Sequence, residues 1–251
     1  MRGIPRPHRS HRTLAHEGHP LLRAAGSLIV GVLLTYLFLQ YAWPILMSTM
    51  TDAANATGRM ATPLNDTLLG ISNRIPLPNM PTLNLSTALW VAGICLVILV
   101  VTSIVPGKHT PLRYWVAANA VVLMLSAIYA FFTERVAYDA GSFMFLLERT
   151  SLLMILCAPA FIAFVVALLP FTISEIALML VLMVVSDAIF AAVRIAAFAL
   201  IVSHFGAIAE MNIYMFFGPL LDVAYFMTVY SLVIVSLSKR VNRNGGAWKW
   251  L

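Results

Sequence analysis

Ionisable side chains lie inside the long apolar stretches of this chain. Arg194 and Asp187 fall in the fifth stretch, and Asp222 falls in the sixth. A charge in the hydrocarbon of a bilayer costs about 2.5–3.5 kcal/mol even on the scale that gives the smallest values, so such residues usually mark a functional site. We therefore expect the function to centre on Arg194.

A thiol adds nucleophilic chemistry to this set. Cys157 lies in the fourth apolar stretch. A thiol attacks as the thiolate, and an apolar setting disfavours that form. A fixed guanidinium such as that of Arg194 would oppose this effect and would also stabilise a tetrahedral oxyanion. His204, just beyond the predicted end of the fifth stretch, is the candidate proton carrier, together with Glu210.

The composition is that of an integral membrane protein. Of 251 residues, 61% are hydrophobic and 10% are charged, whereas a soluble domain has about 25% charged residues. The two cysteines, Cys95 and Cys157, both fall in apolar stretches, so no disulfide framework is expected. The chain carries no recognisable nucleotide, phosphate or metal motif. We expect no cofactor, no metal and no nucleic-acid partner.

Six stretches are each near or above the roughly 20 residues that a helix needs to cross a bilayer. They cover residues 24–47, 87–105, 114–133, 149–169, 175–203 and 213–237. The segments on the side of the N-terminus carry eleven Lys and Arg residues, and the opposite loops carry four. The positive-inside rule therefore predicts an all-α bundle of six transmembrane helices with both termini in the cytoplasm. We expect the bilayer to be a bacterial inner membrane.

Polar segments flank and interrupt these spans. Residues 1–23 and 238–251 form basic tails, and residues 48–86 form one external loop rich in Asn, Thr and Pro. We interpret the four histidines of the first tail as part of a mobile polar segment rather than a metal site. Chance is the simplest explanation of the three N-x-S/T sequons in the loop, at Asn55, Asn65 and Asn84.

Residues near the predicted boundaries fit this topology. Trp43 and Trp90 lie near the predicted outer boundary, where aromatic anchors gather. Most acidic residues, Glu148 among them, fall in the predicted outside loops.

The topology converts sequence position into depth, at about 1.5 Å per helical residue. Counted from the outer boundary, Cys157 lies roughly 12 Å deep, Arg194 roughly 13 Å and Asp222 roughly 15 Å. Three consecutive helices are therefore predicted to bring these side chains into one layer. Asp187 lies on the same helix face as Arg194 but about 10 Å deeper.

A purely structural interpretation of the same residues is also open. Arg194 would then be neutralised by Asp222 or Asp187, in an ion pair that holds the bundle together. Cys157 would be a small packing residue, as most buried cysteines are. Cys95 lies as far into its own span with no charge near it in sequence, and we interpret it as packing.

Two short motifs resemble the exosortase/archaeosortase family. They are Ile155–Phe161, with the sequence ILCAPAF, and Ala192–Ala196, with the sequence AVRIA. The similar region covers residues 145–235, about the C-terminal third of the chain. The family consists of polytopic membrane transpeptidases that cut a C-terminal transmembrane tail from exported proteins. The resemblance implies that Cys157 is the nucleophile, that Arg194 assists it and that a His or Arg completes the set.

The chain departs from the family pattern at several positions. A small polar residue and Gly usually follow the Cys, where this chain has Ala158 and Pro159. The Asn that usually stands three residues before the Arg is Ala191 here, and the third position, ahead of Gly218, falls at Met215. His204 is then the candidate for the third role.

The sequence supports three functions. The first is an exosortase-like membrane cysteine protease or transpeptidase that processes exported proteins with a C-terminal membrane tail at the outer face. The second is a non-enzymatic polytopic subunit of a membrane export or assembly complex, with membrane-protein partners. The third is a small transporter that uses Asp187, Arg194 and Asp222, although the sequence shows no inverted repeat of the kind that transporters have.

Overall fold

The computed structural model describes residues 12–14, 20–81, 85–104, 110–132, 139–167, 171–243 and 248–250. The described chain is mostly helical. Six of its helices are long and apolar enough to cross a membrane, which confirms the predicted helical class and the six predicted spans at that level. The side of the membrane on which the termini lie stays a prediction.

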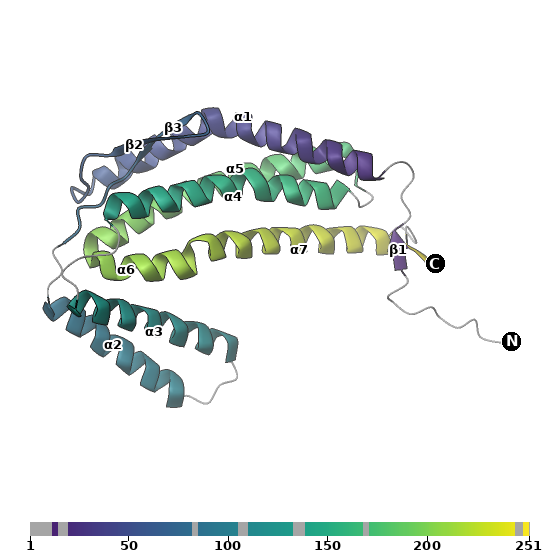
Figure 1. The fold of residues 1–251 in the computed structure, drawn as a ribbon. Helices are drawn as coiled ribbons and strands as arrows, with labels where there is room; N and C mark the ends of the chain where they lie inside the picture. The colour runs from purple at the N-terminus through teal and green to yellow at the C-terminus, as the bar shows by residue number, and fades with distance from the viewer. Residues whose placement is uncertain are drawn as a thin grey trace. The chain divides into compact units, whose positions relative to one another are not determined.

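Helices make up all six spans. The first five are α1 (Pro20–Asn55), α2 (Leu85–Ile104), α3 (Thr110–Phe132), α4 (Ala140–Ala167) and α5 (Ile173–Phe205) (Figure 1). The sixth consists of α6 (Ala207–Asn212), the π-helix η2 (Ile213–Phe217) and α7 (Pro219–Arg243). The strands β2 (Leu64–Leu68) and β3 (Ile71–Ile75) form a hairpin, and β1 (Arg12–Leu14) pairs with β4 (Trp248–Trp250) in antiparallel register.

Several helices extend beyond the apolar stretches that predict them. α1 begins at Pro20 and continues to Asn55, so the first part of the predicted loop 48–86 is helical. α4 begins at Ala140, nine residues before the predicted start of its span, and α7 continues to Arg243 within the predicted tail 238–251. Hydropathy places these boundaries wrongly because a helix satisfies its own backbone hydrogen bonds and therefore does not have to end where polar residues begin.

The predicted external loop contains a folded hairpin. β2 and β3 are joined by Leu69 and Gly70, whose φ angles of 53° and 79° match the tight turn that suits the twist of a hairpin. Side chains alternate along β3, so that Ile71, Asn73 and Ile75 are buried while the residues between them are exposed. The hairpin thus has one buried face and one polar face.

Contacts divide the chain into two compact units. The first unit comprises Met1–Leu37, Ile155–Asp187 and Val223–Leu251, and the second comprises Phe38–Met154 and Ala188–Asp222. In the first unit, a carbon added at Gly31 would lie 3.5 Å from the Ala160 backbone and 3.6 Å from the Leu180 side chain. The small residues Gly31 and Ala160 therefore let α1 approach α4 closely, as small residues do in membrane helix pairs.

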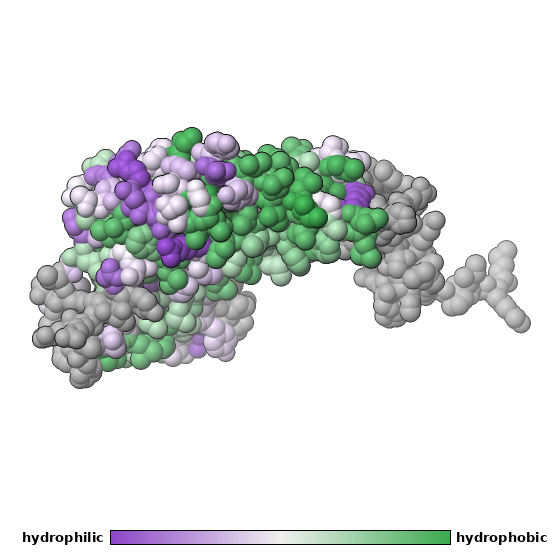
Figure 2. Space-filling view, turned by 45° about the horizontal axis from the view of Figure 1, so that its top comes forward, coloured by the Kyte–Doolittle hydropathy of each residue, from purple (hydrophilic) through white to green (hydrophobic). Residues whose placement is uncertain are grey.

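The second unit holds the hairpin. α2 packs against α3, and α3 packs against α6, around a small core of Ala88, Ala127 and Ile208. The Thr51 hydroxyl donates a hydrogen bond of 2.9 Å to the carbonyl of Arg74, which fixes β3 to α1. Hydrophilic residues gather over the hairpin, and hydrophobic residues cover most of the helix surface in view (Figure 2).

Candidate functional site

Small, buried residues precede Arg194 on α5. Ala191 and Ala192 are fully buried, and Ala188 is buried one turn earlier on α5. Alanines leave space beside the helix for a long side chain and for a neighbouring backbone. Arg194 is itself only 5% exposed.

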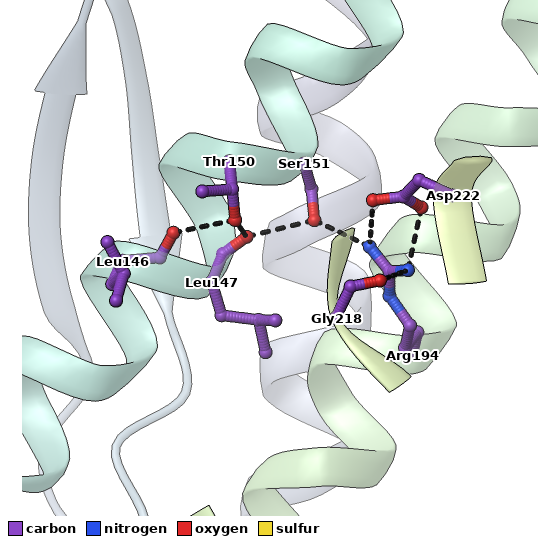
Figure 3. Close-up of polar contacts among 7 residues, drawn as sticks. All are labelled: Leu146, Leu147, Thr150, Ser151, Arg194, Gly218 and Asp222. Carbon is purple, nitrogen blue, oxygen red and sulfur yellow. Dashed lines mark hydrogen bonds and ion pairs between the residues drawn. The ribbon is translucent and has the colours of Figure 1, made fainter. Parts of the chain in front are cut away.

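Asp222 neutralises Arg194 through two parallel hydrogen bonds. Arg194 Nη1 lies 2.6 Å from Asp222 Oδ1, and Nη2 lies 2.9 Å from Oδ2 (Figure 3). Asp222 is 2% exposed. This two-point geometry matches the guanidinium fork to the carboxylate and gives strong charge-assisted bonds. The pair therefore has no net charge.

Two further acceptors complete the contacts of the terminal guanidinium nitrogens. Nη1 donates to the Gly218 carbonyl at 3.2 Å, and Nη2 donates to the Ser151 hydroxyl at 2.8 Å. Ser151 in turn donates to the Leu147 carbonyl at 2.9 Å (Figure 3). In the described part of the chain, Arg194 Nε has no hydrogen-bond partner. The network thus links α4, α5 and the start of α7.

The sixth span is broken where it meets Arg194. The π-helix η2 ends at Phe217, Gly218 follows it, and α7 starts at Pro219. A side-chain carbon at Gly218 would lie 2.5 Å from the Tyr214 carbonyl oxygen, so the close approach here requires glycine. Asp222 follows in the first turn of α7, where the helix dipole favours a carboxylate. π-Helices are rare and often lie at functional sites.

The structure assigns Cys157 to a different unit from Arg194. Cys157 belongs to the stretch Ile155–Asp187 of the first unit, and its side chain is exposed. The α4 residue that contacts Arg194 is Ser151, six positions earlier. Six positions turn a helix through roughly 600°, so Cys157 points about 120° away from Ser151 on α4. Cys95 is buried, in agreement with its predicted packing role.

His204 lies far along α5 from Arg194. Ten positions separate the two residues, which corresponds to about 15 Å along the helix axis. The His204 ring is exposed, and its Nδ1 lies 2.8 Å from the Leu200 carbonyl oxygen. The structure therefore does not bring His204 to the guanidinium.

Asp187 is fully buried, and of the two carboxylates proposed to neutralise Arg194 it is Asp222 that forms an ion pair with it. The histidines of the N-terminal tail and Asn84 lie outside the described residues. Asn65 is exposed on β2, and Asn55 closes α1. Among the described residues, no group of three or more His, Cys, Asp or Glu residues is placed to hold a metal ion.

A second buried polar cluster lies one turn away on α4. Glu148, predicted to lie in an outside loop, is 0% exposed. Its Oε1 accepts hydrogen bonds from Trp43 Nε1 at 3.2 Å and from Asn73 Nδ2 at 2.6 Å. Trp43 is also 0% exposed, so its predicted role as an interfacial anchor is wrong. The indole nitrogen needs a buried acceptor, and Glu148 provides it.

An exposed ion pair beside this cluster also joins the hairpin to α4. Arg149 Nε and Nη2 donate to the two carboxylate oxygens of Asp66 at 2.9 and 3.1 Å. The hydrogen bond from Arg149 is the main reason that the pKa of Asp66 lies below its ordinary value. Arg74 on β3 lies 3.7 Å from Asp52 on α1. Polar contacts therefore hold the hairpin to two helices.

Sequence reasoning did not identify Ser151, Asn73 or Glu148 as site residues. Ser151 is one hydroxyl in an apolar run, and Asn73 lies in a segment predicted to be a loop. The alternation along Ile71–Ile75 is the signal that could have revealed the hairpin.

Comparisons with protein families, with curated proteins and with solved structures found no match for the chain.

Proposed function

We propose that the chain is a non-enzymatic polytopic subunit of a membrane export or assembly complex. The observation that supports this function is the pairing of Arg194 with Asp222. An arginine that stabilises an oxyanion must offer donors to the reacting carbonyl. Here Nη1 and Nη2 already serve Asp222, Gly218 and Ser151. Such a network suits a structural connection between helices.

The second helix offers surface for partners. Large apolar side chains are exposed along α2, namely Leu89, Trp90, Ile94, Leu96, Val97, Val100, Val101 and Ile104. In a bilayer this surface contacts lipid or the helices of another membrane protein, because both are apolar. We propose that partner helices pack here, and that the bilayer is a bacterial inner membrane with both termini on its cytoplasmic side.

Photo-crosslinking in the native membrane tests the partner surface. A photoreactive residue at Val97, which is 61% exposed, is expected to give one discrete adduct with another membrane protein. The same residue at Cys95, which is 2% exposed, is the matched control and is expected to give only adducts within the chain. Adducts with lipid alone at Val97 and at neighbouring α2 positions would contradict the proposal.

The second candidate is an exosortase-like cysteine transpeptidase. The observation in its favour is that the Cys157 thiol is exposed whereas that of Cys95 is buried, so a substrate could reach only Cys157 of these two. Cys157 would attack a peptide carbonyl of an exported protein with a C-terminal membrane tail. Arg194 would have to leave Asp222 to stabilise the oxyanion, and His204 would have to carry the proton.

Mass spectrometry of the protein purified from its native membrane separates the two candidates. The transpeptidase requires a thioester to a peptide on Cys157, with none on Cys95, and its loss in Arg194→Ala. The subunit requires an unmodified Cys157 and normal assembly of the Cys157→Ala variant with its partner. A peptide adduct on Cys157 would overturn the first proposal.

A further inference from the structure

The cluster of Glu148, Asn73 and Trp43 has more acceptors than donors. Glu148 Oε1 accepts both hydrogen bonds, from Trp43 and from Asn73. Glu148 Oε2 and Asn73 Oδ1 are also buried, and neither has a hydrogen-bond partner in the described structure. Two buried acceptors without a donor are costly, because each loses its bonds to water without a replacement.

The nearby charges do not compensate an ionised Glu148. Arg149, the next residue on α4, donates to Asp66 on β2, and its side chain is 50% exposed. Arg74 on β3 pairs with Asp52 on α1. The cations near the cluster are thus engaged by other carboxylates, and Asp66 adds a negative charge that opposes ionisation of Glu148.

One proton on Glu148 would give both lone acceptors of the cluster a hydrogen-bond partner. We infer that Glu148 is a neutral carboxylic acid whose Oε2–H donates to Asn73 Oδ1 while Asn73 Nδ2 donates to Glu148 Oε1. The two side chains then form a cyclic acid–amide pair, and both lone acceptors gain a partner. Exchanging the oxygen and nitrogen of the amide does not change the result. Oε1 and Oδ1 would then face each other, and one proton would still be required.

The acid–amide pair acts as a pH-sensitive clasp between the hairpin and α4. Asn73 lies on β3 and Glu148 on α4, so their two hydrogen bonds join segments that are far apart in sequence. Loss of the proton would leave Glu148 Oε2 and Asn73 Oδ1 without a donor, whereas Oε1 would keep its hydrogen bonds from Trp43 and Asn73. The clasp therefore holds at low pH and weakens as pH rises through the titration of Glu148.

Infrared spectroscopy of the full-length protein in nanodiscs tests the protonation of Glu148. The wild type is expected to show the carbonyl band of a protonated carboxyl group, and this band is expected to vanish in Glu148→Gln and at high pH. Asn73→Leu removes one bonding partner and is expected to shift the same band to higher frequency. Identical carboxyl bands in the wild type and Glu148→Gln at every pH, or an unmoved band in Asn73→Leu, would overturn the inference.

Hydrogen exchange of the hairpin tests the clasp. Glutamine can make both bonds of the pair without a proton, because its amide donates to Oδ1 and accepts from Nδ2. At one alkaline pH, the β2–β3 peptide is expected to exchange faster in the wild type than in Glu148→Gln. At acidic pH the two proteins are expected to exchange alike. Equal exchange at both pH values would contradict a pH-sensitive clasp.

Discussion

Asp222 and Glu148 are two buried carboxylates of the same unit, and the cost of burying their charge is offset in different ways. Asp222 is 2% exposed and faces the guanidinium of Arg194 at 2.6 and 2.9 Å. Glu148 is 0% exposed and faces an amide and an indole, both of which are neutral. A buried charge needs a partner of opposite charge or must give up its ionisation. The first carboxylate is therefore balanced by a cation, and we infer that the second is balanced by a proton.

The two kinds of buried pair respond differently to pH and to mutation. The ion pair stays neutral whenever both groups are ionised, so removing either member leaves an uncompensated charge. The acid–amide pair stays neutral only while its proton is bound, so replacing the acid by its amide preserves it.

The largest effect is expected from removing one member of the ion pair. Arg194→Met leaves Asp222 buried without its cation, which is expected to lower the free energy of unfolding by about 3–5 kcal/mol. Thermal and denaturant unfolding in detergent measure this change. Arg149→Met is the matched control, because that arginine belongs to an exposed pair and its loss is expected to cost at most about 1 kcal/mol. Equal losses of unfolding free energy in Arg194→Met and Arg149→Met would contradict the distinction between the buried pair and the exposed pair.

A smaller effect separates two replacements of Glu148. Glu148→Ala leaves the Trp43 indole and the Asn73 amide without an acceptor, and is expected to cost about 1–3 kcal/mol of unfolding free energy. Glu148→Gln is expected to match the wild type in acid and to exceed it in alkali, because glutamine has no proton to lose. Unfolding curves at several pH values measure both. A Gln variant as unstable as the Ala variant in acid would contradict the neutral pair.

The indole contribution is expected to be smaller still. Trp43→Phe keeps most of the buried ring and removes the N–H that donates to Glu148. The loss of one hydrogen bond is expected to cost about 0.5–1.5 kcal/mol. Denaturant unfolding of Trp43→Phe in the wild-type and Glu148→Gln backgrounds measures it, and similar losses in both are expected because Gln keeps the acceptor.

The smallest effect concerns the exposed pair of Asp66 and Arg149. Asp66→Asn is expected to cost about 0.2–1 kcal/mol near neutral pH. Because Arg149 lowers the pKa of Asp66, its stabilisation is present above the ordinary pKa of an aspartate and is lost as pH falls through the lowered value. Asp66→Asn should therefore flatten the acid side of the stability profile. The Glu148 pair has the opposite pH dependence, because it loses stability as pH rises. A loss of unfolding free energy in alkali that disappears in Asp66→Asn would therefore contradict the roles given to Asp66 and to Glu148.

The sequence predicted the ion pair better than its surroundings. Arg194 and Asp222 were expected at similar depth because each lies a similar number of residues from the same predicted membrane face, and the structure pairs them. The same reasoning selected Cys157 on α4, whereas Ser151 makes the contact. The difference is six residues, about 9 Å along a helix. The charged residues Glu148 and Arg149 mark the predicted boundary of the span, whereas α4 begins at Ala140.

The environment of Glu148 could not be read from hydropathy. Its partners Asn73 and Trp43 are 75 and 105 positions away in sequence. Local patterns of polarity report helices and strands, but they do not report which distant segment covers a polar residue. A charged residue beside Arg149 therefore looked like part of a solvated loop. Glu148 contacts Asn73 of the hairpin. The composition of residues 48–86 did not indicate that this hairpin forms.

A double-mutant cycle on Arg194 and Asp222 tests the central claim that the pair is a self-contained structural connection. Arg194→Met and Asp222→Leu are each expected to lower the free energy of unfolding by about 3–5 kcal/mol. The double variant is expected to be at least as stable as the wild type, because it leaves no buried charge and fills a similar volume. A double variant that loses the sum of the two single effects would contradict the claim.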